Sequence, residues 1–497
     1  MITAAHGPRW SRADTIALVA ITTLAAALRL MRLGDPDSIM FDETYYAKDS
    51  CWYANTSTSL CDVEGEQTGV HPPLGKWLLA AGIRVLGYDS FGWRFAAAVA
   101  GVVTVALLYL LARKLFRATL AASLTAGLLA LDTLHFVQSR IAMLDIFVPL
   151  FGLAAVLFVV IDRDVALARG SGPARAEGRR IRRPWRLAAG VAAGAATASK
   201  WSGAFFVVLV IVLSVVWEVA ARRERGETHP FAGAVRGEWS SMLAYLVLVP
   251  VLVYVATFIG QVHGSLLGAP WSEGTWLRAW WDRQIQMADF HLGLEATHLY
   301  ESPPWSWILV RRPVSYFYET TGTGERAEIL ALGNPILWWA SIPALAFVAY
   351  RWARRRSYRG PEGLILAGFV VTYGPWLLQQ TDRSAVFLFY LLPSLPFMYL
   401  AIGRVAAVLG SSWEARAAVS IVAALAAGSF SFFYPVMAKV PLTVEQWSDR
   451  MWYQSCDRAP ARTTTSTTIE ERHRSTITRT NITTLEESPP PRGWCWI

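Results

Sequence analysis

The chain has 497 residues, of which 54% are hydrophobic and 17% charged, and its formal net charge is +9. The hydrophobic share exceeds that of average soluble domains, and the apolar residues gather in long blocks, which excludes an ordinary soluble protein. A nucleic-acid-binding protein is disfavoured as well, because the basic residues are divided among short loops instead of forming one patch.

The apolar blocks, taken in chain order, predict transmembrane helices. A bilayer core needs about 17–25 apolar residues for each spanning helix. Eleven blocks meet or approach this length, at residues 14–33, 94–112, 118–135, 141–161, 187–201, 203–221, 241–260, 334–350, 361–379, 385–403 and 415–434. The first block is too long for a cleavable signal peptide, so we expect none. The predicted fold class is an all-α polytopic membrane protein with about 11 transmembrane helices.

The loops between the blocks predict the orientation. Of the 46 Lys and Arg residues, 22 lie in alternate connections, at residues 113–117, 162–186, 222–239, 351–360 and 404–416. By the positive-inside rule, these loops and the N-terminus lie in the cytoplasm. Two long connections, 34–93 and 261–333, then face the extracytoplasmic side. Loops of this size commonly carry function.

The first outer loop opens with two adjacent carboxylates in the stretch MFDETYY (40–46). Asp42 and Glu43 follow the first apolar block directly, and carboxylates at a membrane edge are costly unless they have a function. Cys51 and Cys61 lie further along the same loop. Two cysteines ten residues apart in an oxidising compartment are a disulfide candidate.

A second segment of this loop, GVHPPLGKWLLAAG (69–82), carries His71 and Lys76. Its two prolines fix the backbone, and the apolar run after them is typical of a helix at the membrane surface. The two polar residues are compatible with a binding role, and the segment is equally compatible with a simple turn that enters an interfacial helix.

More ionisable residues fall at the outer ends of the predicted helices, namely Arg29, Arg140, Asp145, Lys200 and Arg383. Single residues of this kind can be anchors that extend to the headgroups. Five that converge on one membrane face indicate a functional site instead.

Cations at the headgroup level suit a lipid-linked sugar phosphate. The phosphate gains negative charge as the sugar leaves it, and Arg or Lys beside it stabilises that charge. The acceptor hydroxyl is a weak nucleophile and needs a carboxylate base, for which Asp42 and Glu43 are candidates. One base, one nucleophile and one leaving phosphate predict a single displacement that inverts the sugar carbon.

The second outer loop contains the aromatic stretch THLYESPPWSWILVRRPVSYFYE (297–319). Its Trp and Tyr residues are compatible with an interfacial belt or with stacking on a sugar or an extended acceptor; they are Trp305, Trp307, Tyr316 and Tyr318. His298 is disfavoured as a metal ligand, because few partners at metal spacing surround it.

Together these motifs resemble the protein O-mannosyltransferase family, in its actinobacterial branch, which consists of polytopic glycosyltransferases of the GT-C class. The resemblance is carried by LRLMRLGDPDSIMFDE (28–43), HPPLGK (71–76), SRIAMLD (139–145), SKWSG (199–203), HLYESPPWSW (298–307) and RSAVFLFYLLPSLPF (383–397). Their order and spacing match the family from about residue 15 to 455.

The resemblance implies transfer of mannose from polyprenyl-phosphate-mannose to Ser or Thr of secreted proteins. It assigns Asp42 and Glu43 to the acceptor as the catalytic pair, and it places Arg29, Arg140 and Lys200 near the donor phosphate. The supporting or acceptor-binding positions would be His71, Lys76, Asp145, His298, Trp305, Arg383 and Tyr390. No metal and no cofactor besides the lipid donor is expected.

The expected domains are a GT-C transmembrane catalytic domain over 1–435, an extracytoplasmic segment over 436–456, and a tail over 457–497. The second outer loop is too short for the β-trefoil domain of eukaryotic members. The tail has ten Thr and six Arg in 41 residues and no helical or strand period, so we predict a disordered segment or an out-of-frame product.

Two alternatives remain open on the residues alone. One is another GT-C transferase that delivers a polyprenyl-phosphate sugar to a lipid or a glycan. The other is a transporter of lipid-linked sugar, which would need polar residues across the midplane of several helices and is commonly built from duplicated halves. The resemblance also implies a location in the cell membrane, an extracytoplasmic active site, and the Sec translocon as a possible partner.

Overall fold

The computed structural model describes residues 10–54, 61, 68–170, 183–258, 276–294, 298–355, 358–378, 385–453, 462–472, 475–486 and 496. The elements of the first half are α1 (Arg12–Leu30), α2 (Glu43–Ala54), α3 (Leu74–Leu86), α4 (Ser90–Phe116), α5 (Thr119–Ala130), α6 (Thr133–Gln138), α7 (Phe147–Gly170), α9 (Pro184–Ser199), η1 (Trp201–Gly203), α10 (Ala204–Glu224), α11 (Pro230–Met242), η2 (Leu243–Leu248) and α12 (Val249–Ala256).

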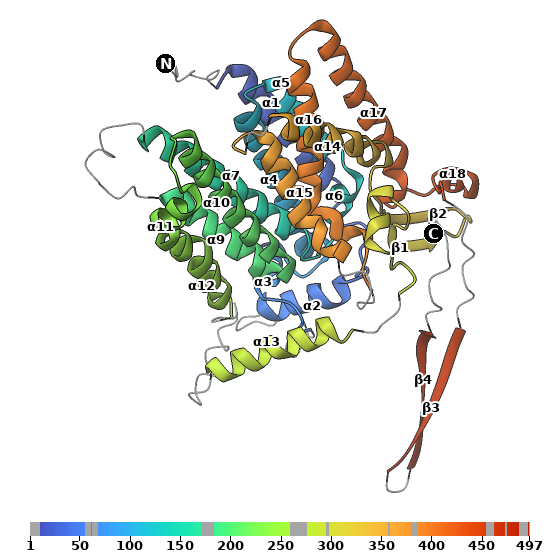
Figure 1. The fold of residues 1–497 in the computed structure, drawn as a ribbon. Coiled ribbons are helices and arrows are strands. Elements are labelled where there is room, and N and C mark those ends of the chain that lie inside the picture. The colour runs from blue at the N-terminus through green and yellow to red at the C-terminus, as the bar shows by residue number, and fades with distance from the viewer. Residues whose placement is uncertain are drawn as a thin grey trace.

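The elements of the second half are α13 (Trp276–Leu292), η3 (Pro304–Leu309), β1 (Val314–Thr320), β2 (Arg326–Ala331), α14 (Pro335–Arg355), α15 (Pro361–Leu378), η4 (Leu388–Ser394), α16 (Leu395–Leu409), α17 (Trp413–Met437), α18 (Val444–Ser448), β3 (Arg462–Arg472) and β4 (Ser475–Glu486). The long helices run side by side as a bundle, and α2 and α13 lie across one end of it (Figure 1).

Polar side chains set the beginnings of several helices. Ser11 and Asp14 form a capping box that starts α1. Asp89 accepts a hydrogen bond from the backbone N–H of Gly92 at 2.7 Å and so starts α4. Asp132 starts α6 in the same way, and this cap divides the predicted block 118–135 into α5 and α6.

Among the described residues, eight helices are long and apolar enough to span a bilayer. The prediction of a helical membrane protein is therefore confirmed, whereas the count of about 11 is not. The other three predicted blocks correspond to shorter or more charged helices: α5 has 12 residues, α9 has 16, and α7 ends in a charged stretch from Asp162 to Asp164.

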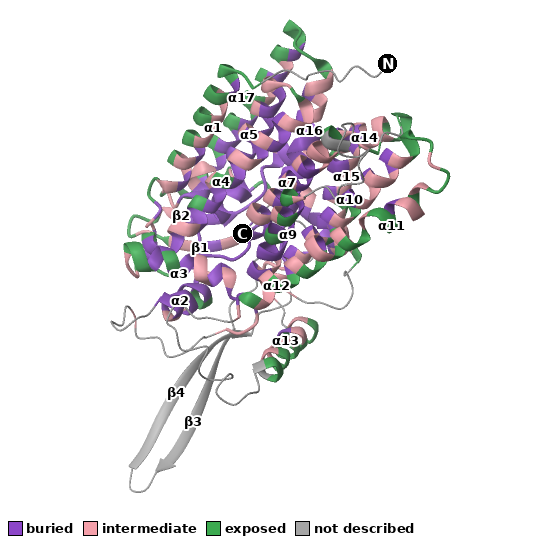
Figure 2. Ribbon diagram, turned by 90° about the vertical axis from the view of Figure 1, so that its left-hand side faces the viewer, coloured by how far each residue is buried: buried purple, intermediate pink, exposed green. Residues whose placement is uncertain are grey.

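Burial is unequal across the bundle. Buried residues gather on the central helices, whereas α1, α11 and α17 expose much of their surface (Figure 2). The exposed side chains on these outer helices include Ile16, Val235 and Ile421, which are apolar. Apolar side chains that face outward are expected where lipid is the solvent.

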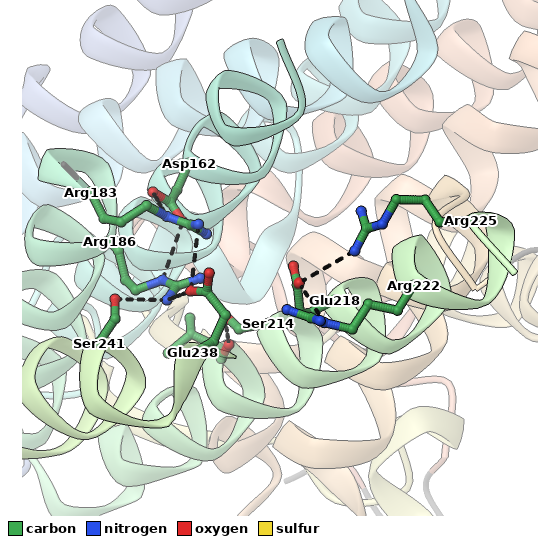
Figure 3. Close-up of polar contacts among 10 residues, drawn as sticks. Asp162, Arg183, Arg186, Ser214, Glu218, Arg222, Arg225, Glu238 and Ser241 are labelled. Carbon is green, nitrogen blue, oxygen red and sulfur yellow. Dashed lines mark hydrogen bonds and ion pairs between the residues drawn. The ribbon is translucent and has the colours of Figure 1, made fainter. Parts of the chain in front are cut away.

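Ion pairs join the helices at the end of the bundle that lies opposite α2. Arg183 and Arg186, at the start of α9, both bond the carboxylate of Asp162 near the end of α7 (Figure 3). Arg186 also reaches Glu238 of α11, with 2.6 Å between the Nη1 and Oε2 atoms. Buried charged groups need partners, and these pairs join α7, α9 and α11.

The two strands β1 and β2 form an antiparallel hairpin that the sequence did not predict. The pairing runs from Val314 opposite Ala331 to Thr320 opposite Arg326, and it shifts between Ser315 and Phe317. Tyr316 is thus the extra residue of a β-bulge.

The structure describes two strands of the tail and its penultimate residue, and the disordered or out-of-frame origin expected for residues 457–497 stays a prediction. Strands β3 and β4 pair as an antiparallel hairpin. Beyond them, Trp496 is buried and stacks on Trp452, with ring centroids 5.8 Å apart. Its indole N–H donates to the carbonyl oxygen of Val310 at 2.7 Å. The last tryptophan therefore packs against the membrane domain.

Candidate active site

The site begins at the turn between α1 and α2. Phe41 has a φ of 47°, which lies in the left-handed region, and Asp42 follows it. The backbone carbonyl of Asp42 accepts the first helical hydrogen bonds of α2, from Tyr45 and Tyr46 at 3.0 Å. Within the described part of the chain, the Asp42 carboxylate itself accepts no hydrogen bond, so the half-buried group is available to a substrate.

The neighbouring Glu43 has a different environment. Its carboxylate is fully buried and forms a bidentate ion pair with Arg94 of α4, in which Nε lies 2.7 Å from Oε1 and Nη2 lies 2.8 Å from Oε2. It also accepts hydrogen bonds from the backbone N–H groups of Met40 and Ala142. A carboxylate with all these partners holds the loop together, so we do not assign proton transfer to it.

Two further predicted residues, Lys200 and Asp145, lie close enough to Asp42 for their charges to act on it. The ammonium group of Lys200 donates to both oxygens of Asp145, at 2.9 and 2.8 Å, and lies 5.0 Å from the centre of the Tyr390 ring. Lys200 follows the end of α9, and Asp145 precedes the start of α7. The structure thus brings together Asp42, Asp145, Lys200 and Tyr390, which are separated in the sequence.

The environment of Asp42 raises the pKa of its carboxyl group. Burial raises the pKa of Asp42 to about 6, with a smaller contribution from the negative charge of Asp145, while the positive charge of Lys200 opposes the rise. A carboxylate with this pKa is a stronger base than an ordinary aspartate and is still ionised at neutral pH.

Tyrosine and glutamine side chains complete the surroundings. The ring of Tyr316 lies 4.5 Å from the ring of Phe41, and its hydroxyl accepts a hydrogen bond from Gln138 at 2.6 Å. Tyr46 is buried one helical turn after Asp42. Sequence reasoning placed Tyr316 among general aromatic residues and missed Gln138, which lies in the matched region only one residue before SRIAMLD.

Arg29 and Arg140 have protein partners. The Arg29 guanidinium is fully buried and donates to His135 Nδ1 at 2.8 Å and to Ser139 Oγ at 3.2 Å. Arg140 donates to backbone carbonyls at the end of α1, among them those of Arg29 at 2.9 Å and Arg32 at 2.8 Å. These bonds satisfy the carbonyl groups that a helix end leaves open. A donor-phosphate role for either arginine stays a prediction.

The HPPLGK segment packs against α2. Lys76 forms a fully buried ion pair with Asp49, at 2.9 Å between Nζ and Oδ2. The ring of His71 lies 5.9 Å from that of Tyr46 and 5.1 Å from that of His291 in α13. Lys76 therefore ties α3 to α2, His71 packs between α2 and α13, and a direct role in binding stays a prediction for both. A disulfide bond joins Cys51, in α2, to Cys61.

Of the remaining predicted residues, His298 lies near the site and Trp305 lies at the surface. His298 lies against Phe41 and Phe387, with ring centroids 6.2 and 5.0 Å away. Trp305 is 45% exposed and carries the guanidinium of Arg311 above its ring. Arg383 lies outside the described residues. No cluster of three or more His, Cys, Asp or Glu residues suited to a metal occurs in the described ranges, and the expected independence from metals stays a prediction.

Comparison with known proteins decides the family. Two family models match, Dolichyl-phosphate-mannose-protein mannosyltransferase over residues 89–266 and the C-terminal four TMM region of protein-O-mannosyltransferase over residues 276–456. A polyprenol-phosphate-mannose–protein mannosyltransferase of Mycobacterium tuberculosis is 33% identical over 479 residues, covering 88% of this chain and 90% of that relative. The chain belongs to the protein O-mannosyltransferase family. The namesake in Mycolicibacterium smegmatis is 32% identical to this mannosyltransferase, covering 89% and 93% of the two chains.

Solved structures share the fold of this mannosyltransferase. The S. cerevisiae protein O-mannosyltransferase Pmt1-Pmt2 complex bound to the sugar donor matches with a TM-score of 0.71 at 16% identity, over 90% of this chain and 93% of that one. ArnT from Cupriavidus metallidurans bound to undecaprenyl phosphate matches with a TM-score of 0.51 at 18% identity, over 85% and 65%. The predicted family and the GT-C architecture are confirmed.

The main residue that sequence reasoning missed in the mannosyltransferase is Arg94. Besides its ion pair with Glu43, it donates to the backbone carbonyls of Leu33, Pro36 and Ser38 and so shapes the loop before Asp42. A signal was present, because Arg94 lies near the start of a long apolar helix, where a charged residue needs a partner.

Proposed function

We propose that this enzyme transfers mannose from polyprenyl-phosphate-mannose to Ser or Thr hydroxyl groups of polypeptides. One observation supports the proposal most: the half-buried carboxylate of Asp42 lies within the electrostatic influence of the Lys200–Asp145 ion pair. It does so in a chain that matches a mycobacterial protein mannosyltransferase over most of its length. The names of those relatives specify both the lipid-linked donor and the protein acceptor, and they do not favour a lipid acceptor or a transporter.

The proposed reaction is a single displacement. Asp42 takes the proton from the acceptor hydroxyl while that oxygen attacks the anomeric carbon of the mannose. The bond between this carbon and the phosphate oxygen breaks, and polyprenyl phosphate leaves with the bonding electrons. Lys200 stabilises the negative charge that grows on the phosphate. Attack opposite the leaving group inverts the configuration of the sugar carbon.

The basic residues divide between two roles in this proposal. Lys200 faces the carboxylates and is the cation whose field acts most on Asp42, so it is our candidate for contact with the donor phosphate. Arg29 and Arg140 hold the end of α1 against α6 and the loop after it. We propose that they place the site rather than bind the donor.

We further propose that the protein lies in the cell membrane with its N-terminus in the cytoplasm and Asp42 on the outer side. The distribution of basic loops supports this orientation. Polypeptides would then meet the site as they emerge from the membrane, which makes the Sec translocon a candidate partner.

Reconstitution tests the function. Vesicles that contain the full chain and synthetic polyprenyl-phosphate-mannose should transfer mannose to a Thr-rich peptide, and Asp42→Asn should not. Labelled mannose in an alkali-labile peptide fraction is the expected result. Label that appears only in a lipid or glycan fraction would overturn the protein-acceptor proposal, and wild-type rates for Asp42→Asn would overturn the assignment of the base.

A further inference from the structure

Phe41, the residue directly before Asp42, has an unusual backbone. Its φ of 47° lies in a region that residues with a Cβ atom rarely adopt, and a bulky aromatic residue there is an outlier. Such a conformation persists only where the surrounding structure determines it, and it is found preferentially at functional sites.

Four rings surround the Phe41 side chain. The nearest is Tyr316, at 4.5 Å between ring centroids, and His298, Phe389 and Phe387 follow at 6.2, 6.2 and 6.5 Å. We call these four residues the Phe41 cage. Edge-to-face and offset contacts at such distances are favourable, so the cage holds the ring in one place.

The cage is itself anchored. Phe387 and Phe389 stack on each other with an interplanar angle of 7°, and His298 lies edge-on to Phe387 at 5.0 Å. These residues come from the second outer loop and from the stretch that enters η4, whereas Phe41 belongs to the first outer loop. The cage therefore connects the two loops at the residue next to the proposed base.

Tyr316 is the best-defined member of the cage. It is the extra residue of the β1 bulge, and bulges commonly redirect a side chain next to an active site. Gln138, a fully buried residue of α6, donates from Nε2 to the Tyr316 hydroxyl at 2.6 Å. Because a buried side-chain hydrogen bond fixes both partners, Gln138 sets the orientation of the ring that packs on Phe41.

We propose that the Phe41 cage positions the Asp42 carboxylate for proton transfer, with Tyr316 and Gln138 as the positioning residues that fix the cage. Neither Phe41, nor the four cage residues, nor Gln138 touches the reacting atoms, and the inference rests on the proposed role of Asp42 as base. Since α2 begins at Glu43 and the left-handed turn lies at Phe41, a shift of the Phe41 ring rotates the peptide that carries Asp42. A displacement of about 1 Å in a reacting group can cost about 100-fold in rate.

The test uses the full chain in vesicles with polyprenyl-phosphate-mannose and a Thr-rich peptide. We expect Phe41→Gly and Tyr316→Leu to lower kcat by about 30-fold while the donor KM changes by less than about threefold. Tyr316→Phe keeps the ring but loses the hydrogen bond from Gln138, so its kcat should lie between those of these two variants and that of the wild type. In Phe41→Gly and Tyr316→Leu, the acidic limb of the pH profile of kcat/KM should move from about pH 6 toward the ordinary aspartate value of about 4, because a displaced Asp42 carboxylate gains contact with water.

Two comparisons separate positioning from folding. Phe158→Leu removes a ring of similar size that pairs with Trp185 at 5.8 Å, away from the site, and should leave kcat and the pH profile unchanged. Phe41→Gly adopts a positive φ without strain, so wild-type kcat in this variant would show that the cage is dispensable. Rates that fall only in proportion to the amount of folded, donor-binding enzyme would also overturn the inference.

The outcome for Asp42→Asn, measured in parallel, distinguishes the two proposals. If Asp42→Asn is inactive and the cage variants keep wild-type kcat, the cage inference fails while the proposed base stands. If Asp42→Asn is active, the proposed base fails, and the inference about the cage fails with it.

Discussion

Glu43 and Arg94 form a fully buried ion pair directly beside Asp42, with 2.7 Å between Oε1 and Nε. This pair separates the functions of two acids that are neighbours in the sequence. The Glu43 carboxylate bonds to Arg94 and accepts from two backbone N–H groups, whereas the Asp42 carboxylate lies within the electrostatic influence of Lys200. We therefore assign the proposed proton transfer to Asp42 and not to Glu43.

Replacing Asp42 by Asn should abolish measurable transfer. A positioned general base contributes about 10²–10⁴-fold, and the amide cannot take the proton. Initial rates of mannose transfer to a Thr-rich peptide measure the effect, with Glu414→Gln, on a carboxylate at the start of α17, as a matched control. Activity of Asp42→Asn within about threefold of wild type would contradict the role, since a base is worth far more.

The pH dependence should follow the titration of Asp42. The base works only when it is ionised, so a pKa of about 6 predicts that kcat/KM falls about tenfold per pH unit below pH 6 and levels off above it. Lys200→Met removes the cation that lowers this pKa, and the limb should move to higher pH. A limb that stays in place in Lys200→Met would show that the two groups do not interact.

Replacing Arg94 by Leu should destabilise the protein strongly. Removing one partner of a buried ion pair leaves the other charge uncompensated, at a cost of about 3–5 kcal/mol. Thermal unfolding in detergent measures the loss, and Glu43→Gln combined with Arg94→Leu should recover part of it. Arg278→Leu is the matched control, because the Arg278 and Asp282 side chains are 85% and 56% exposed. Equal unfolding midpoints for Arg94→Leu and Arg278→Leu would refute the prediction.

Replacing Arg140 by Ala distinguishes the two roles considered for this residue. The hydrogen bonds from Arg140 to carbonyls at the end of α1 predict a lower unfolding midpoint with an unchanged donor KM. The family resemblance predicts a raised donor KM instead. Titration of the reconstituted variant with polyprenyl-phosphate-mannose measures that KM. A clear rise in the donor KM at an unchanged unfolding midpoint would show that Arg140 binds the donor phosphate.

Breaking the disulfide between Cys51 and Cys61 should lower stability without altering the chemistry. A bond that closes a loop of this length is worth about 3 kcal/mol in the chain-entropy account. Cys51→Ser with Cys61→Ser should therefore unfold at a lower temperature than wild type, and reducing agent should lower the wild-type midpoint to the same value. A kcat for the double variant below one tenth of wild type would show that the loop acts in catalysis.

Much of this protein could be predicted from its sequence because the signals are local. Long apolar blocks predict membrane helices, since each helix satisfies its own backbone hydrogen bonds within one stretch of chain. The helix bounds within the short blocks were harder to predict, because single polar residues interrupt them: Asp132 caps the start of α6, and Lys200 caps the end of α9. Counting apolar residues does not detect such interruptions.

The motifs also predicted the family and singled out Asp42, whereas the partners of each charged residue depend on the tertiary structure. Arg29, Arg140 and Lys200 look alike as cations near a predicted membrane face. Packing places Arg29 against His135, Arg140 against the end of α1, and only Lys200 against carboxylates of the site. The sequence by itself determined the membrane class, the family and the acidic pair, because these depend on composition and short motifs. Only the tertiary structure decided which acid is paired and what surrounds Phe41, because those contacts join residues more than fifty positions apart.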